Sequence, residues 1–213
     1  MAGDGVIISY RDMRRLIGIM GIVHPLLLAL GGRLIFGESL QNSMSHYYYT
    51  PMRDIFVSFS FSTGMFLLCY RGYDLHDRIV SVIAGTSAMI VAYFPTAPAG
   101  VTSPRQDVIS HIHAFAAFLF LGALAYFCLV LFPKHGANAL SIQKRRRNVV
   151  YRVSGVVIVA GLLFITAFIS FDPLRRAIET YHPLFFVEAS CFVAFGVAWL
   201  VKGEMLFAEA RTP

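Results

Sequence analysis

The sequence predicts an all-α polytopic membrane protein, a single bundle of six transmembrane helices with both termini in the cytoplasm. Apolar residues make up 57% of the 213 residues and charged residues 14%, against about 45–50% and about 25% in a soluble domain. The mean hydropathy is +0.65. The apolar residues gather in six runs, and a membrane span needs about 20 such residues. This length leaves no room for a sizeable soluble domain, so we expect residues 1–213 to form one transmembrane domain.

Each apolar run is expected to be a helix, because backbone groups without partners cannot face lipid. The first run follows Arg14 and Arg15. It is longer than the hydrophobic region of a signal peptide, which has about 7–15 residues, and it lacks a clear cleavage site. Pro25 should kink this helix. The second and third runs are short, at 16 residues each. The predicted spans are 16–36, 55–70, 79–94, 108–132, 149–170 and 184–201.

The distribution of basic residues predicts the orientation. Of the 18 Lys and Arg residues, thirteen fall on the side that holds both termini, and five fall on the other. This bias places the termini in the cytoplasm. The densest cluster, 144–147 with Arg152, favours attraction to anionic lipid at about 1 kcal/mol per residue. It lacks the interleaved aromatic residues of a nucleic-acid footprint, so no nucleic-acid partner is expected.

The outer segment 37–54 reads GESLQNSMSHYYYTPMRD. Tyrosines suit the headgroup level of a membrane, where ring and hydroxyl meet different media. Tyr47 and Tyr48 are alternatively the wall or lid of an outer pocket. Arg53 is either a donor to an anion or headgroup, or the partner of a carboxylate.

Polar residues recur every four positions at the start of the second helix. Asp54, Ser58 and Ser62 form a stripe on one face. Such a stripe hydrogen-bonds neighbouring helices, or it lines a hydrated path below an outer vestibule.

Glu188 lies inside the apolar run FFVEASCFVAF. An ionisable group at this depth indicates a functional site. We expect it to face the bundle interior and to meet a donor from the second or fourth helix, with Ser58, His111 and His113 as candidates. The predicted binding residues are Tyr47, Tyr48, Arg53, Asp54, Ser58 and Glu188.

Histidines gather at the outer ends of the predicted helices. The candidate metal ligands are His46, His111, His113 and His182. With Asp54 they could converge on a divalent metal such as zinc, whose bound water would be a nucleophile. No H-x-x-x-H pair supports this, so hydrogen bonds to loop carbonyls or water, or a proton relay, stay open.

His24 lies near the middle of the first helix. Haem ligation is disfavoured, because a partner histidine at matched depth is lacking. We expect a core histidine beside the Pro25 kink. The three cysteines lie in apolar runs without a C-x-x-C motif, so neither a zinc knuckle nor a disulfide framework is expected.

Four strings carry a resemblance: SMSHYYYTPMRDIFV, CYRGYD, FPT and KRRRNVVYRVSG. They resemble an uncharacterised family of bacterial multi-span membrane proteins, and the tyrosine loop is the most specific part. The resemblance implies residence in a bacterial inner membrane and implies no activity. The chain differs from alkaline ceramidases and adiponectin-receptor-like hydrolases, because it lacks their seventh helix and H-x-x-x-H pair.

These features favour binding or passage of a small solute, ion or lipid at a polar pocket in the outer leaflet. A metal-dependent hydrolase acting on a membrane lipid is the competing class, and a structural or assembly subunit is the third. Membrane lipid is the expected partner, and a homo-oligomer is compatible with the sequence. The sequence does not decide whether the protein is an enzyme or a transporter.

Overall fold

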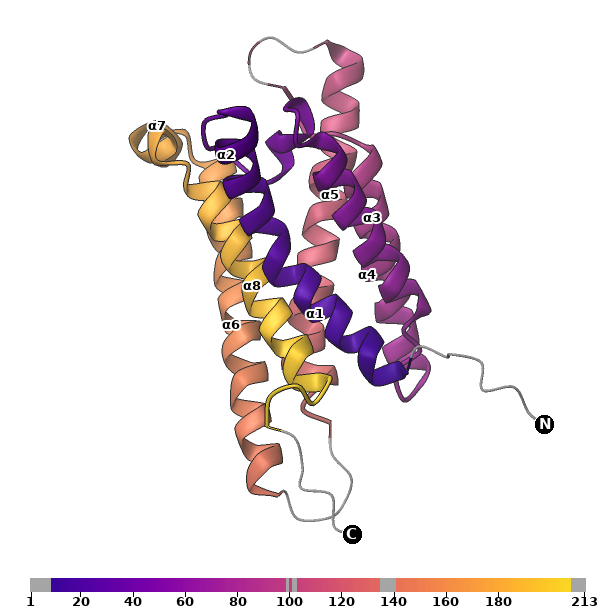
Figure 1. Ribbon diagram of the computed structural model, residues 1–213. Coiled ribbons are helices and arrows are strands. Elements are labelled where there is room, and N and C mark those ends of the chain that lie inside the picture. Colours follow the sequence, from indigo (N-terminus) through magenta and orange to yellow (C-terminus); the bar gives the residue numbers. More distant parts are fainter. Residues whose placement is uncertain (1–8, 99, 101–102, 135–140, 208–213) are drawn as a thin grey trace, which may run out of the picture.

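The computed structural model describes residues 9–98, 100, 103–134 and 141–207, and within these ranges the regular structure is entirely helical. Long helices run side by side along the bundle (Figure 1). In chain order the elements are α1 (Tyr10–Leu26), η1 (Leu27–Gly31), α2 (Gly32–Phe36), η2 (Ser45–Tyr49), α3 (Arg53–Cys69), α4 (Leu75–Tyr93), α5 (Pro104–Tyr126), η3 (Phe127–Leu131), α6 (Ile142–Ser170), α7 (Asp172–Ile178), η4 (Glu179–Tyr181) and α8 (Pro183–Lys202).

The six long helices form a ring around a shared core. Going round it, α1 packs beside α8, α8 beside α6, then α5, α4 and α3, which returns to α1. The start of α1 meets the end of α8, since Arg15 Nε donates a hydrogen bond to the Gly203 carbonyl at 3.0 Å. We call this the terminal end. The opposite end, where α2 and α7 lie (Figure 1), is the loop end.

Within the described residues, five helices are long and apolar enough to cross a membrane: Tyr10–Phe36, Leu75–Tyr93, Pro104–Leu131, Ile142–Ser170 and Pro183–Lys202. The chain therefore has the character of a multi-pass membrane protein. The remaining predicted span corresponds to α3, which is shorter at 17 residues. Of the basic residues near the two ends on which the predicted orientation depends, Arg211 lies outside the described residues.

Most helices begin earlier than the apolar runs predict, and the reason is capping. Ser9, Asp74 and Ser141 each accept a hydrogen bond from the backbone amide three residues on. Ser103 and Gln106 form a reciprocal capping box. A polar cap satisfies the free amides of the first turn, so the helix continues beyond its apolar part.

The first span changes its hydrogen-bond pattern directly after Pro25. Residues Leu27–Gly31 form a π turn, and α-helical geometry resumes at Gly32. Proline has no amide hydrogen to donate, and π turns are a known site of helix bending. The helix then ends at Gly37, which takes a left-handed conformation with φ of 69°.

Two pairs of neighbouring helices touch through glycine. A Cβ added to Gly18 on α1 would lie 2.8 Å from the Gly196 carbonyl oxygen on α8. A Cβ added to Gly64 on α3 would lie 2.7 Å from the Gly85 carbonyl oxygen on α4. Small residues that let backbones approach are the usual basis of helix packing in membranes.

The buried side chains form two clusters. The larger one fills the middle and the terminal end and contains Trp199, Phe127 and Tyr70. The smaller one lies at the loop end, and Leu28, Tyr47 and Phe185 are among its members. The second cluster fixes the loop segment that carries the candidate site.

Candidate functional site

The segment between α2 and α3 folds back onto the bundle at the loop end. The Phe185 amide donates to the Asn42 carbonyl at 3.1 Å. The Tyr49 hydroxyl donates to the Thr96 carbonyl at 2.6 Å. Tyr47 is only 1% exposed and packs against the Phe185 ring. The segment is thus part of the folded core, and its three tyrosines have different environments.

Glu188 on α8 holds this segment by its main chain. The Met44 amide donates to Glu188 Oε2 at 2.7 Å, and the Ser45 amide is also directed at the carboxylate. The expectation that Ser58, His111 or His113 donates to Glu188 was wrong, because backbone amides of the infolded loop reach the carboxylate instead. Hydrogen bonds from backbone amides to a carboxylate are charge-assisted and strong.

His113 on α5 links two loops. Its Nδ1 donates to the Phe94 carbonyl at 2.6 Å, and its Nε2 lies 2.9 Å from Ser45 Oγ. A carbonyl only accepts, so the proton is on Nδ1, and Nε2 of the neutral ring accepts from the serine hydroxyl. His113 therefore fits the interpretation that the outer histidines hydrogen-bond loop carbonyls.

His46 is the second imidazole near this point. Its Nδ1 shares a hydrogen bond of 2.7 Å with Ser43 Oγ. Burial lowers the pKa of His46 below its usual value, because the charged ring loses water. His46 is therefore neutral at pH 7.

A cavity of about 270 Å³ opens between α5 and α6 at the loop end; we call it the loop-end cavity. Its polar lining comes from the infolded loop and the adjoining helix ends. The rest is apolar, including Leu121 on α5 and Leu162 on α6. Ala114 and Phe118 line it and are also exposed on the side of the bundle. The polar residues that line it are Ser43, Ser45, His46, Thr96, Thr166, Ser170, His113 and Glu188.

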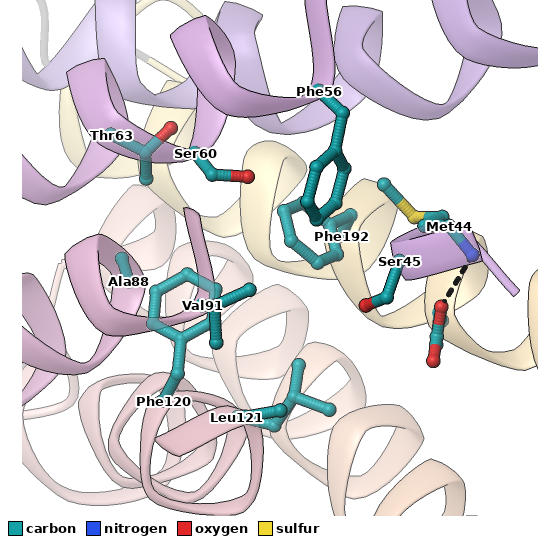
Figure 2. A pocket seen from close by; sticks show the side chains of 12 residues that line it. Met44, Ser45, Phe56, Ser60, Thr63, Ala88, Val91, Phe120, Leu121 and Phe192 are labelled. Atoms are coloured by element: carbon teal, nitrogen blue, oxygen red, sulfur yellow. Dashed lines mark hydrogen bonds between the residues drawn. The ribbon is translucent and has the colours of Figure 1, made fainter. Parts of the chain in front are cut away.

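A smaller cavity of about 40 Å³ lies deeper, between α3, α4 and α5; we call it the buried cavity. Figure 2 shows Ser60 and Thr63 of α3 on one side and Phe120 of α5 on the other. Ser45 and Glu188 line both cavities. The volume suffices for water, since one molecule needs about 10–15 Å³. Polar groups therefore continue from the loop end toward the middle of the bundle.

Four of the predicted binding residues lie elsewhere. Tyr48, Arg53, Asp54 and Ser58 line a shallow hollow between the start of α3 and the end of α4. The Arg53 guanidinium lies 5.3 Å from the centre of the Tyr48 ring. Together with Glu188 in the cavities and Tyr47 in the core, the six residues occupy three places.

The other outer histidines do not join His46 and His113 around the loop-end cavity. His111 Nδ1 donates to the carbonyl of Asp107, one turn earlier on α5, at 2.6 Å. His182 Nδ1 bonds Asn42 Oδ1 at 3.0 Å. In the described part of the chain, no group of three or more His, Cys, Asp or Glu residues could hold a metal ion.

His24 is buried, at 1% exposed. Its ring lies 5.2–5.8 Å from the rings of Phe56, Phe59 and Phe192. Neither ring nitrogen has a hydrogen-bond partner among the described residues. The burial of His24 agrees with the expected core histidine. The described residues, however, provide no hydrogen-bond partner for its ring.

Sequence reasoning missed several hydroxyl groups of the site. Ser60 and Thr63 face the buried cavity, whereas Ser58 of the predicted stripe is exposed. Their spacing from Phe56 and Leu67 fits one buried helical face and could have identified them. Ser45 begins the short 3₁₀ helix η2, which is too brief to show a periodic pattern.

The loop-end cavity can hold a ligand with a polar head and an apolar body. Ser45 Oγ and the carboxylate of Glu188 provide hydrogen-bonding groups at its polar end, and aliphatic side chains provide the rest. Comparisons of the chain with family models, with curated proteins and with solved structures find no match.

Proposed function

We propose that the protein binds a small amphipathic molecule, a membrane lipid or a similar solute, in the loop-end cavity. The observation that carries this proposal is the mixed lining of the cavity: the infolded loop and the neighbouring helices supply polar groups, and aliphatic and aromatic side chains of α5 and α6 supply an apolar wall. Ligand sites combine an apolar wall with a few placed polar groups. The exposed residues Ala114 and Phe118 offer lateral entry from lipid.

The polar end favours a head group that donates hydrogen bonds. Among the described residues that line the cavity, Glu188 is the one carboxylate, and its Oε2 accepts from the Met44 amide. The histidine His46 is neutral near pH 7 and brings no positive charge. A hydroxyl or ammonium group therefore suits this site better than a phosphate.

Passage of a proton or a small solute is the second candidate. Ser45 and Glu188 line both cavities, and the buried cavity extends to Thr63 on α3. Intramembrane carboxylates commonly mark such paths. Proton-coupled uptake by reconstituted vesicles, lost in Glu188→Gln, would favour this candidate over simple binding.

The proposed setting is a bacterial inner membrane, crossed six times with both ends in the cytoplasm. As a helix, α3 is about 25 Å long at 1.5 Å per residue, and a bilayer can thin slightly around such a span. The meeting of α1 with the end of α8 supports an even number of crossings. A C-terminal reporter active only in the periplasm would contradict this topology.

Filling the cavity tests the binding proposal. Ala114→Phe adds a ring where Ala114 lines the cavity, and Ala160→Phe adds the same ring at an exposed position of α6 outside the lining. We expect bound lipid, measured by mass spectrometry of the purified protein, to fall in Ala114→Phe and to persist in Ala160→Phe. Equal lipid content in both variants and the wild type would overturn the proposal.

A further inference from the structure

Two cations at the terminal end pack on a shared aromatic ring. The Arg14 guanidinium lies 5.8 Å and the Lys202 ammonium 4.9 Å from the centre of the Tyr73 ring. Arg14 also lies over Tyr70, at 5.7 Å, and Lys202 over Phe132, at 5.3 Å. We call Arg14, Tyr70, Tyr73, Phe132 and Lys202 the terminal-end cluster.

The two cations of this cluster lack acidic partners. In the part of the chain that the structure describes, no carboxylate oxygen lies within 4.0 Å of Arg14 or Lys202. The nearby acidic groups serve other cations. Asp77 and Asp74 both bind Lys134, at 2.6 and 2.9 Å.

Further positive charge surrounds Lys202. Arg14, Lys144 and Arg147 act on it by repulsion, against attraction from Asp77. Glu204 lies 2.8 Å from Arg11 and 3.8 Å from Arg147. Lys202 is only 9% exposed, so water screens this repulsion weakly. Such an arrangement is stabilised by an added anion.

Two buried nitrogen donors at the terminal end have no acceptor among the described residues, although Arg14 also hydrogen-bonds Tyr70 and Tyr73. The Nε atom of Arg14 is buried without an acceptor among the described residues. The same holds for Nε1 of Trp199, whose ring packs against Tyr70 and Phe132. A buried donor without an acceptor is costly. An anion with several oxygens would supply acceptors.

We propose that the terminal-end cluster is a binding site for a phosphate-bearing anion. Phosphate combines negative charge with several acceptor oxygens, which matches guanidinium and ammonium donors. The source is either a lipid headgroup or a free phosphate, since both present the same chemistry. The site is separate from the loop-end cavity, and it takes an anion, which the loop-end cavity does not favour.

Substitution of each cation tests the site by two readouts. Thermal unfolding of the detergent-purified chain is followed with and without inorganic phosphate, and again in vesicles of phosphatidylcholine alone or mixed with phosphatidylglycerol. The variants are Arg14→Gln and Lys202→Met, and the control is Arg146→Gln, an exposed position beside Arg147. Each variant removes one positive charge.

We expect the anion to stabilise the wild type and Arg146→Gln. Arg14→Gln and Lys202→Met should each weaken that effect roughly tenfold in apparent affinity. A response to inorganic phosphate identifies a free anion, and a response only to phosphatidylglycerol identifies a headgroup. Without any anion, Lys202→Met should keep or raise the melting temperature, because it relieves buried charge repulsion.

Three results would overturn the proposal. The first is no response of the wild type to either phosphate source. The second is an equal loss of response in Arg146→Gln, which would indicate diffuse surface attraction. The third is a lower melting temperature of Lys202→Met in anion-free detergent with an unchanged anion response, which would assign Lys202 to packing on Tyr73 and Phe132. Should one of the two variants fail to fold, the other decides by the same criteria.

Discussion

The polar residues around the loop-end cavity are imidazole, hydroxyl and carboxylate groups held largely by main-chain atoms, whereas the terminal-end cluster consists of two cations packed against aromatic rings. Glu188 accepts from the Met44 amide and His113 donates to the Phe94 carbonyl. Arg14 and Lys202 instead lie over Tyr70, Tyr73 and Phe132.

The difference concerns what each end can bind. Backbone partners already satisfy much of the hydrogen-bonding capacity at the loop end, so a ligand there needs only a few polar contacts and an apolar body. At the terminal end Arg14 and Lys202 pack on aromatic rings, with no acidic partner in the part of the chain that the structure describes. A ligand there must bring negative charge, and shape matters less.

The largest expected effect is on packing at the terminal end. Trp199 is fully buried, and its ring lies 4.9–5.7 Å from those of Tyr70, Phe127, Phe132 and Phe195. Trp199→Ala should lower the free energy of unfolding by about 3–5 kcal/mol, because it leaves a large void. Denaturant unfolding in detergent measures this loss.

Phe186→Ala is the matched control for this substitution, since Phe186 is on the same helix and 56% exposed. A loss in Trp199→Ala no greater than in Phe186→Ala would mean that aromatic packing does not stabilise the terminal end. The contrast between the two ends would then fail.

A smaller loss is expected where the loop end depends on one acceptor. Glu188→Leu leaves the Met44 amide buried without its carboxylate partner, at a cost of about 2 kcal/mol. Glu188→Gln keeps an acceptor oxygen and should lose less. Thermal unfolding compares the two with Glu179→Leu, an exposed carboxylate at the same end.

If Glu188→Gln is as unstable as Glu188→Leu, the charge of the carboxylate matters more than its role as an acceptor. The loop end would then resemble the terminal end in depending on charge, and the distinction drawn above would need revision.

The smallest effect is a dependence of stability on pH at the loop end. The pKa of His46 is lowered in the folded protein by burial, so the unfolded chain takes up the proton first as pH falls. Stability should be level above pH about 6.5 and should decline below it. His46→Gln should flatten this decline in thermal melts recorded across the range.

Other groups titrate in the same range, so some decline should persist in the variant. A profile of His46→Gln as steep as that of the wild type would show that His46 does not contribute. Its hydrogen bond with Ser43 would then be present in both protonation states.

The positions of the long helices were predictable because they follow from apolar runs. The starts were predicted several residues late, since caps such as Ser103 lie outside those runs. With 17 residues, α3 is too short to be identified as a membrane span by length and composition. The sixth crossing therefore stays a proposal.

The candidate site was less predictable. Glu188 was expected inside the bundle as a functional residue, and it does line both cavities, but its partner comes from a loop whose path no periodicity encodes. His111 and His113 are two positions apart on one helix and therefore face different directions. The terminal-end cluster joins Arg14, Tyr73 and Lys202, which no local sequence pattern connects.

The π turn after Pro25 has a consequence for how the length of this chain can vary. A π turn holds about one residue more than an α turn. Deleting one residue within Leu27–Gly31 would leave a regular α turn, and the segments on either side would keep their present orientation. A deletion in the regular part of the same helix would instead rotate the following segment by about 100°, and Gly32, now against Tyr47 and Met52, would face other neighbours. Homologous chains should therefore tolerate the loss of one residue at Leu27–Gly31 more readily than elsewhere in this span.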